Sequence, residues 1–124
     1  MSGKLLEEEL SYRVRGCVYE VYRELGAGFL EKIYESALLI ELRAAGMNAE
    51  AQRPIRVRYK GREIGQFAAD IVVEDKILLE LKALSTLRPE HEAQILHYLK
   101  ATGLKLGLLI NFTAPRAEIK RIIA

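Results

Sequence analysis

The apolar positions at the start of the chain recur every three or four residues, which is the spacing of one face of an α-helix. In "LSYRVRGCVYEVYRELGAG" these positions are Leu10, Val14, Cys17, Val18, Val21 and Leu25. Glycine adopts the left-handed conformation that ends helices at low cost, so we expect this helix to stop at Gly26. A second helical spacing runs from Phe29 to about Ala45 and ends at Gly46. The chain is therefore predicted to open with two helices.

The middle of the chain changes to the two-residue alternation of β-strands. In "PIRVRYKG" apolar and basic side chains alternate, with Ile55, Val57 and Tyr59 on one face and Arg56, Arg58 and Lys60 on the other. A turn is expected at Gly61. The segment "GQFAADIVVEDKILLELKA" then predicts two more strands around a turn at Glu74 to Lys76.

The last third of the chain predicts one more helix and two strands. Pro89 suits a first helical turn, where its missing N–H costs nothing, and Gly103 is expected to end the helix. The run "LKLGLLINF" is typical of a buried strand, and "IKRII" predicts a short edge strand. We therefore expect an α/β fold of order ααβββαβ(β), with helices and strands sharing one core in a single domain over residues 1–124.

Composition narrows the class of protein without choosing a function. A chain of 124 residues that is 50% hydrophobic can bury one core of ordinary size. Its net charge of +2 permits an anionic partner but is far from that of a nucleic-acid coat protein. The single cysteine, Cys17, excludes an internal disulfide and fits a reducing compartment, so we expect a cytoplasmic protein. No run approaches the ~20 apolar residues of a membrane span, so no membrane partner is expected.

Two carboxylates and a lysine lie where the strands of the second hairpin should be apolar. Side chains alternate across a strand, so the length of the turn decides which residues share a face. A three-residue turn centred on Asp75 sets Asp70 opposite Glu80, whereas a two-residue turn sets Asp70 opposite Leu79. Only the three-residue turn gives one wholly apolar face and gathers Asp70, Glu80 and Lys82 at the end of the other face.

Such a cluster has a chemical use. Adjacent carboxylates repel each other unless something offsets their charge, and Mg²⁺ is held in proteins by one or two carboxylates, with waters completing its coordination. An ammonium such as that of Lys82 can orient a metal-activated water and stabilise the charge that develops on a phosphate. The alternative is an ordinary ion-pair cluster at the end of a sheet, because acidic and basic residues are common there.

The same residues resemble a known signature. Asp70 followed by "ELK", Glu80 to Lys82, resembles the D…ExK motif of the PD-(D/E)XK nuclease superfamily. The segment "GFLEKIY", Gly28 to Tyr34, matches the GxxExxY motif that names a family of small proteins of this kind. Around these motifs, "VYRELGAGFLEKIYESAL", "ADIVVEDKILLELKA", "HEAQILHYLKATG" and "LGLLINF" extend the resemblance to roughly residues 10–123.

The resemblance implies a restriction-endonuclease-like core, a mixed β-sheet flanked by helices. It also implies a metal site made by Asp70, Glu80, the carbonyl of Leu81 and the helix-borne Glu31, with Lys82 as the catalytic lysine. Without the motif, Glu31 and the residue one turn later, Glu35, would form a solvated acidic stripe; with it, Glu31 is the better ligand and Glu35 a supporting or surface residue.

Gln94 and Tyr98 match the QxxxY motif that follows on the next helix in the helicase-associated exonucleases of the superfamily. With His91 they form one polar stripe that could touch phosphate and base or support Lys82. A stripe that simply faces solvent is the alternative, and a surface position at the helix end is the better interpretation for His91.

The basic strand face gives a second candidate contact with nucleic acid. Arg56, Arg58 and Lys60 would project at about 6 to 7 Å spacing, near the phosphate repeat of a nucleic-acid strand. The alternative is a face that only keeps the protein in solution. On the first helix, Tyr12, Tyr19 and Tyr22 are interpreted as packing or dimer contacts.

Two functions remain in view from the sequence. The first is a nuclease, dependent on Mg²⁺ or Mn²⁺, that hydrolyses phosphodiester bonds in DNA through a metal-activated water. The second is a nucleic-acid-binding or protein-binding module that keeps the fold without efficient cleavage. Since 124 residues leave little room for a separate DNA-recognition domain, specificity would need a homodimer or a larger nucleic-acid-processing complex.

Overall fold

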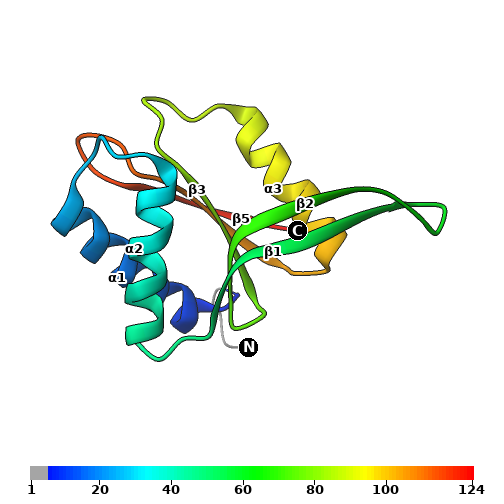
Figure 1. Cartoon of the computed structure of the whole chain (residues 1–124), viewed down its shortest axis with the longest axis horizontal. Helices are drawn as coiled ribbons and strands as arrows, with labels where there is room; N and C mark the ends of the chain where they lie inside the picture. The colour runs from blue at the N-terminus through cyan, green and yellow to red at the C-terminus, as the bar shows by residue number, and fades with distance from the viewer. Residues whose placement is uncertain (1–5) are drawn as a thin grey trace.

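A computed structural model describes residues 6–124, which form one five-stranded sheet with helices on both faces (Figure 1). The elements are α1 (Glu8–Leu25), α2 (Glu31–Ala44), β1 (Ala49–Tyr59), β2 (Arg62–Val73), β3 (Ile77–Lys82), α3 (Pro89–Thr102), β4 (Leu106–Asn111) and β5 (Glu118–Ile123). The strand order is β1-β2-β3-β4-β5; β3 and β4 are parallel and the other neighbours antiparallel. The predicted α/β order is confirmed, including "IKRII" as an edge strand.

The β2–β3 hairpin has the predicted three-residue turn. Val73 pairs with Ile77, and the N–H of Lys76 donates to the carbonyl of Val73 at 3.0 Å. Glu74 and Asp75 adopt positive φ angles of 53° and 55°, which place the chain reversal between them. This register sets Asp70 and Glu80 on the same side of the hairpin.

Alternate residues of the central strands enter two different cores. Ile77, Leu79 and Leu81 pack beneath α1 and α2, whereas Leu78 packs beneath α3. The face that carries Glu80 and Lys82 is therefore the α3 face, as side-chain parity requires.

Helix α3 lies very close to β4. A Cβ added at Gly107 would lie 2.7 Å from Cγ2 of Ile95, inside the normal contact distance. The glycine in "LKLGLLINF" therefore fixes the separation of α3 from the sheet. Gly103 ends α3 in the left-handed conformation at φ 77°, as predicted.

Tyr34 closes the connection between α1 and α2. Its hydroxyl donates to the carbonyl of Gly26 at 2.5 Å and accepts the N–H of Phe29 at 3.2 Å. Its ring stacks on Phe112 with centroids 4.2 Å apart, so this connection lies beside the β4–β5 connection (Figure 1). Gly28 takes a φ of 111° in the same connection. The Gly and Tyr of the GxxExxY motif thus shape the chain that leads into α2.

The predicted start of α2 at Phe29 is wrong by two residues. The helix begins at Glu31, because the positive φ of Gly28 and the extended conformation of Leu30 keep the preceding residues out of helical geometry. Phe29 and Leu30 are left 46% and 79% exposed beside the helix start.

The strict alternation predicted for "PIRVRYKG" is also wrong at its far end. The register of β1 against β2 shifts between Val57 and Arg58, where a bulge inserts Ile64. Lys60 lies beyond β1 in the turn with a φ of 49° rather than on a strand face with Arg58. The outer part of the hairpin extends past the rest of the sheet and along α3 (Figure 1).

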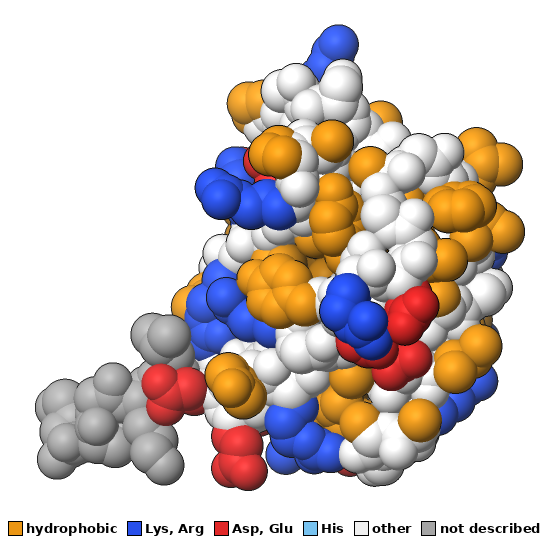
Figure 2. All heavy atoms as spheres, turned by 90° about the vertical axis from the view of Figure 1, so that its left-hand side faces the viewer, with side chains coloured by type: hydrophobic (Ala, Val, Ile, Leu, Met, Phe, Trp, Pro, Cys, Tyr) orange, Lys and Arg blue, Asp and Glu red, His pale blue; other side chains and the backbone are white. Residues whose placement is uncertain are grey.

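The helical face is mixed in character. Figure 2 shows hydrophobic side chains scattered among basic and acidic ones on the side where α1 and α2 lie. Tyr12 and Tyr19 are 77% and 52% exposed, so neither packs into the core, whereas the hydroxyl of Tyr22 donates to the carbonyl of Thr113 at 2.8 Å. Cys17 is buried, as interpreted, and burial raises the pKa of its thiol. In residues 6–124 no helix is both long and apolar enough to cross a bilayer.

The Tyr34 hydroxyl gives a prediction about stability. Tyr34→Phe keeps the stacked ring but leaves the partly buried Gly26 carbonyl without this donor, so we expect a loss of about 0.5–1.5 kcal/mol in the free energy of unfolding. Denaturant unfolding measures the change. Tyr12→Phe, which removes an exposed hydroxyl, is the matched control and should be neutral. Equal stability of wild type and Tyr34→Phe would contradict the role given to this hydroxyl.

Candidate active site

Asp70 and Glu80 lie where the two strands of the hairpin stop pairing through their backbones. The β2–β3 ladder ends at Ile71 and Leu79. Beyond it, the N–H of Asp70 donates to Oε1 of Glu80 at 3.2 Å, and the N–H of Leu81 donates to Oδ2 of Asp70 at 2.8 Å. Each carboxylate therefore accepts a hydrogen bond from a backbone N–H of the facing strand. The predicted convergence of the two carboxylates is confirmed.

Burial makes this pair electrostatically costly. Glu80 is only 6% exposed, and burial followed by the charge of Asp70 raises its pKa to about 8. Burial also raises the pKa of Asp70, with a smaller contribution from the charge of Glu35. The ammonium of Lys82, on the same strand end, opposes both shifts without cancelling them. The site is thus short of positive charge.

A link to α2 was missed by the sequence interpretation. Glu35, 8% exposed, accepts a hydrogen bond from Nε2 of Gln52 at 2.7 Å through one oxygen and from Nζ of Lys32 at 3.2 Å through the other. The side chain of Gln52 also lowers the pKa of Asp70. Gln52 therefore lies between a helix carboxylate and a site carboxylate.

Gln52 holds this position in a strained conformation. Its φ is 53°, and it falls between the paired residues Ala51 and Arg53 of β1. A non-glycine residue in the left-handed region costs of the order of 1 kcal/mol, and such residues gather at functional sites. No sequence pattern marks Gln52. Glu35 had a signal, one helical turn beyond Glu31, but its burial depends on β1 lying across α2.

Glu31 occupies the first position of α2 and is exposed. Its charge contributes to the raised pKa of Glu80, so it lies within electrostatic reach of the pair. Its place at the helix start is where a carboxylate complements the helix dipole. Its role as a metal ligand stays a prediction.

Asn111 fixes the chain just after Lys82. It is fully buried and pairs with Lys82 across the parallel β3–β4 ladder. Its side-chain amide exchanges two hydrogen bonds with the backbone of Leu84, both at 2.9 Å, and the N–H of Phe112 donates to the carbonyl of Lys82 at 2.9 Å. A polar residue within the apolar run "LLINF" was the available signal, because a buried amide needs partners.

The donors present fit a hard divalent cation. Within residues 6–124 no three side chains of His, Cys, Asp or Glu converge as a self-sufficient metal cage. The site offers two carboxylates, which are oxygen donors of the kind that Mg²⁺ combines with several waters; the carbonyl of Leu81 as a further donor stays a prediction. The uncompensated negative charge of the pair is the observation that favours a cation here.

The four predicted nucleic-acid contacts line one groove between α3 and the outer part of the β1–β2 hairpin. The groove has a volume of about 830 Å³, and its walls include Gln94, Tyr98, Arg56 and Arg58. Burial, then the charges of Glu80 and Asp70, raise the pKa of the Tyr98 hydroxyl. One wall of the groove is therefore within electrostatic reach of the carboxylates. His91 instead accepts the N–H of Arg88 at 3.0 Å at the start of α3.

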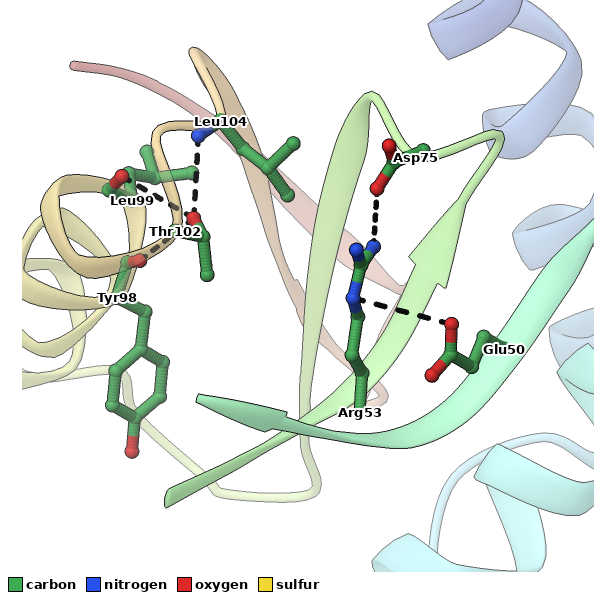
Figure 3. Close-up of polar contacts among 7 residues, drawn as sticks. All are labelled: Glu50, Arg53, Asp75, Tyr98, Leu99, Thr102 and Leu104. Atoms are coloured by element: carbon green, nitrogen blue, oxygen red, sulfur yellow. Dashed lines mark hydrogen bonds and ion pairs between the residues drawn. The ribbon is translucent and has the colours of Figure 1, made fainter. Parts of the chain in front are cut away.

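Polar contacts close the C-terminal end of α3, where Tyr98 lies (Figure 3). The hydroxyl of Thr102 donates to the carbonyls of Tyr98 at 2.9 Å and Leu99 at 3.2 Å, which closes the last turn of α3. In the same view, Arg53 of β1 pairs with Asp75 at 2.5 Å and with Glu50 at 4.0 Å (Figure 3). The positive charge of Arg53 is therefore balanced by these two neighbouring carboxylates.

Comparisons with known proteins agree with this geometry. Residues 8–122 match the sequence model of the PD-(D/E)XK nuclease superfamily, and the chain belongs to that superfamily. Comparison with curated proteins gave no match.

Two crystal structures share the fold. SSO0001 aligns with a TM-score of 0.61 and 21% identity, over 94% of this chain and 58% of its own. This chain therefore spans little more than half the length of that relative. The alkaline exonuclease LHK-Exo from Laribacter hongkongensis aligns with a TM-score of 0.55 and 12% identity, over 97% of this chain and 71% of its own. At these identities the likeness establishes the restriction-endonuclease-like fold.

The raised pKa of Glu80 predicts a pH-dependent stability. Between its ordinary value of 4.5 and about 8, the native state holds a proton that the unfolded chain has released. The free energy of unfolding of the metal-free protein should therefore fall as pH rises through this window. Glu80→Gln should reduce that fall, leaving the contribution of Asp70, and be more stable than wild type by about 1–3 kcal/mol at pH 8, since one pKa unit corresponds to about 1.4 kcal/mol.

Thermal unfolding in chelator at pH 5 and pH 8 measures this difference. Glu63→Gln, which changes an exposed carboxylate on β2, should keep the wild-type pH dependence. A Glu80→Gln protein less stable than wild type at pH 8 would show that the Glu80 carboxylate is not under electrostatic stress.

Proposed function

We propose that this protein is a Mg²⁺-dependent nuclease that hydrolyses phosphodiester bonds in DNA, with Mn²⁺ able to replace Mg²⁺. The Asp70–Glu80 pair, in which Glu80 is buried, with Lys82 on the same strand end, is the observation that carries this proposal. Membership of the PD-(D/E)XK nuclease superfamily and the likeness to an alkaline exonuclease support it.

Each residue of the site has a distinct role in this reaction. Asp70, Glu80, the carbonyl of Leu81 and Glu31 would hold the cation. A bound divalent ion supplies Lewis-acid stabilisation to the phosphate and lowers the pKa of a water. Lys82 orients the attacking water and stabilises the charge that develops on the phosphate oxygens. The water oxygen attacks phosphorus and releases a proton to solvent, the P–O bond to the leaving nucleotide breaks, and the leaving oxygen takes up a proton from solvent.

The groove beside the site would hold the DNA. Arg56 and Arg58 lie along one wall, where they would pair with backbone phosphates, and Nε of Arg56 is 3.8 Å from Oε1 of Glu63. Gln94 and Tyr98 on α3 form the opposite wall and would position the strand against the carboxylates. Charge on the groove walls and its approach to Glu80 through Tyr98 support this placement.

Finer features of the proposal rest on the sequence. We assign the chain to the GxxExxY group within the superfamily and treat residues 1–124 as a single nuclease-like domain. We expect it to work in the cytoplasm as a homodimer or in a larger nucleic-acid-processing complex. The exposed Tyr12 and Tyr19 on α1 offer a contact surface for such assembly.

Metal binding provides a direct test of the site. Asp70→Asn keeps the shape of the side chain but removes one anionic donor, so it should weaken Mn²⁺ binding at least about 10-fold. Isothermal titration calorimetry measures the affinity. Asp75→Asn, in the turn at the other end of the same hairpin, is the matched control. No binding of Mn²⁺ or Mg²⁺ to wild type, with or without DNA, would remove the support for a metal-dependent nuclease.

Lys82 separates a nuclease from a binding module. If Lys82 serves the attacking water, Lys82→Ala should lower the cleavage rate by about 10²–10⁴ while DNA affinity changes little, because the group acts chiefly in the transition state. Cleavage of labelled DNA with Mg²⁺ and binding of the same DNA in chelator give the two readouts. Lys76→Ala removes the same charge at the opposite end of β3 and should leave both unchanged.

A non-cleaving module would behave differently. Lys82 would then be one phosphate contact among several, and its loss would weaken binding modestly and flatten the salt dependence by about one charge. A wild type that binds DNA without cleaving single-stranded, duplex or branched forms would refute the nuclease proposal.

A further inference from the structure

Phe67 is an aromatic side chain left half open inside the groove. It lies on β2, is 49% exposed, and its ring centroid is 5.4 Å from that of Tyr98 at a tilt of 42°. Other large apolar side chains of the hairpin, such as Ile64, are exposed outside the groove lining. Phe67 therefore differs from them in lining the groove.

The groove around Phe67 combines apolar residues with a majority of basic over acidic ones. Its lining includes Val57 and Ala93, the basic residues Arg56, Arg58 and Lys100, and one acidic residue, Glu90. The apolar part can accept the flat face of a base, and the cations can accept phosphates on either side. An aromatic platform within a basic groove is the arrangement by which proteins bind single strands.

A DNA duplex would not use these features together. Its base faces are covered by stacking, and it presents phosphates and base edges to a protein. An open phenyl ring gains nothing from either. The groove volume of about 830 Å³ is within the range of about 300–1,000 Å³ typical of small-ligand sites, which suits nucleotides rather than a duplex cross-section.

We propose that the groove binds an unpaired DNA strand, with one base stacked on Phe67 and its neighbouring phosphates at Arg56, Arg58 and Lys100. This inference rests on the proposed function and specifies the form of its substrate. Because Tyr98 contacts Phe67 and senses the charges of Glu80 and Asp70, the bound strand would be led toward the carboxylate pair. The protein would then act on single strands, frayed ends or flaps rather than within a closed duplex.

The chain has no tryptophan, which allows a specific optical test. Phe67→Trp places a single indole at the platform, and a base stacked on it should quench its emission. The probes are an unlabelled dT12 oligonucleotide and a blunt hairpin duplex of equal phosphate number, both in chelator so that no strand is cut. We expect quenching by dT12 and none by the duplex. Ile64→Trp, on the same strand outside the groove, is the matched control and should be quenched by neither.

Affinity gives the second measurement. Phe67→Ala should weaken dT12 binding by about 5- to 160-fold, equivalent to the about 1–3 kcal/mol that stacking of one base contributes. Its affinity for the hairpin duplex should be unchanged, and Ile64→Ala should bind both probes as wild type does. Equal loss for both probes, quenching of Phe67→Trp by the duplex, or no effect of either variant would overturn the proposal.

These outcomes are separable from those of the nuclease proposal. Stacking of dT12 on position 67 without cleavage by wild type in Mg²⁺ would uphold the groove and refute the nuclease. Cleavage by wild type with no quenching and no loss of dT12 affinity would uphold the nuclease and refute the groove assignment.

Discussion

The structure depends on how two carboxylates are kept together at the end of a hairpin. The carboxylate of Glu80 accepts the N–H of Asp70, and the carboxylate of Asp70 accepts the N–H of Leu81. These bonds hold the two carboxylates next to each other. Burial raises the pKa of both groups, which means that the fold stores electrostatic cost here. Other interactions must offset this unfavourable free energy. The two hydrophobic cores on either side of β3 provide that stabilisation.

The surrounding elements restrict the ways in which this stress can relax. Gln52 reaches from β1 to Asp70, and Glu35 holds Gln52 from α2. Asn111 ties down the segment after Lys82 from β4. Three different elements therefore keep the carboxylates and the lysine in one place. The repulsion between the carboxylates can then be reduced only by a bound proton or a bound cation. Such preorganisation is what stabilisation of a developing charge requires.

Local patterning predicted the parts of this site that lie within one hairpin. Parity on β2 and β3 determined that Asp70 and Glu80 share a side, because only one turn length leaves an apolar face. The start of α2 was misplaced, because the positive φ of Gly28 and the extended conformation of Leu30 override the helical spacing there. The burial of Glu35 and the conformation of Gln52 arise where β1 crosses α2. The spacing of apolar and polar residues along the sequence does not indicate that crossing.

Because Gly107 has no side chain, α3 can pack close to β4 at this position. Ile95 occupies the space that a methyl group at position 107 would need, because its Cγ2 would lie only 2.7 Å from the added Cβ. A larger residue there would act as a spacer and tilt α3 outward, carrying Tyr98 away from Glu80 while leaving every charged and polar residue intact. The position of the groove relative to the carboxylates therefore depends on the absence of a side chain at Gly107. A substitution there could impair the site although Gly107 contacts neither the groove nor the carboxylates.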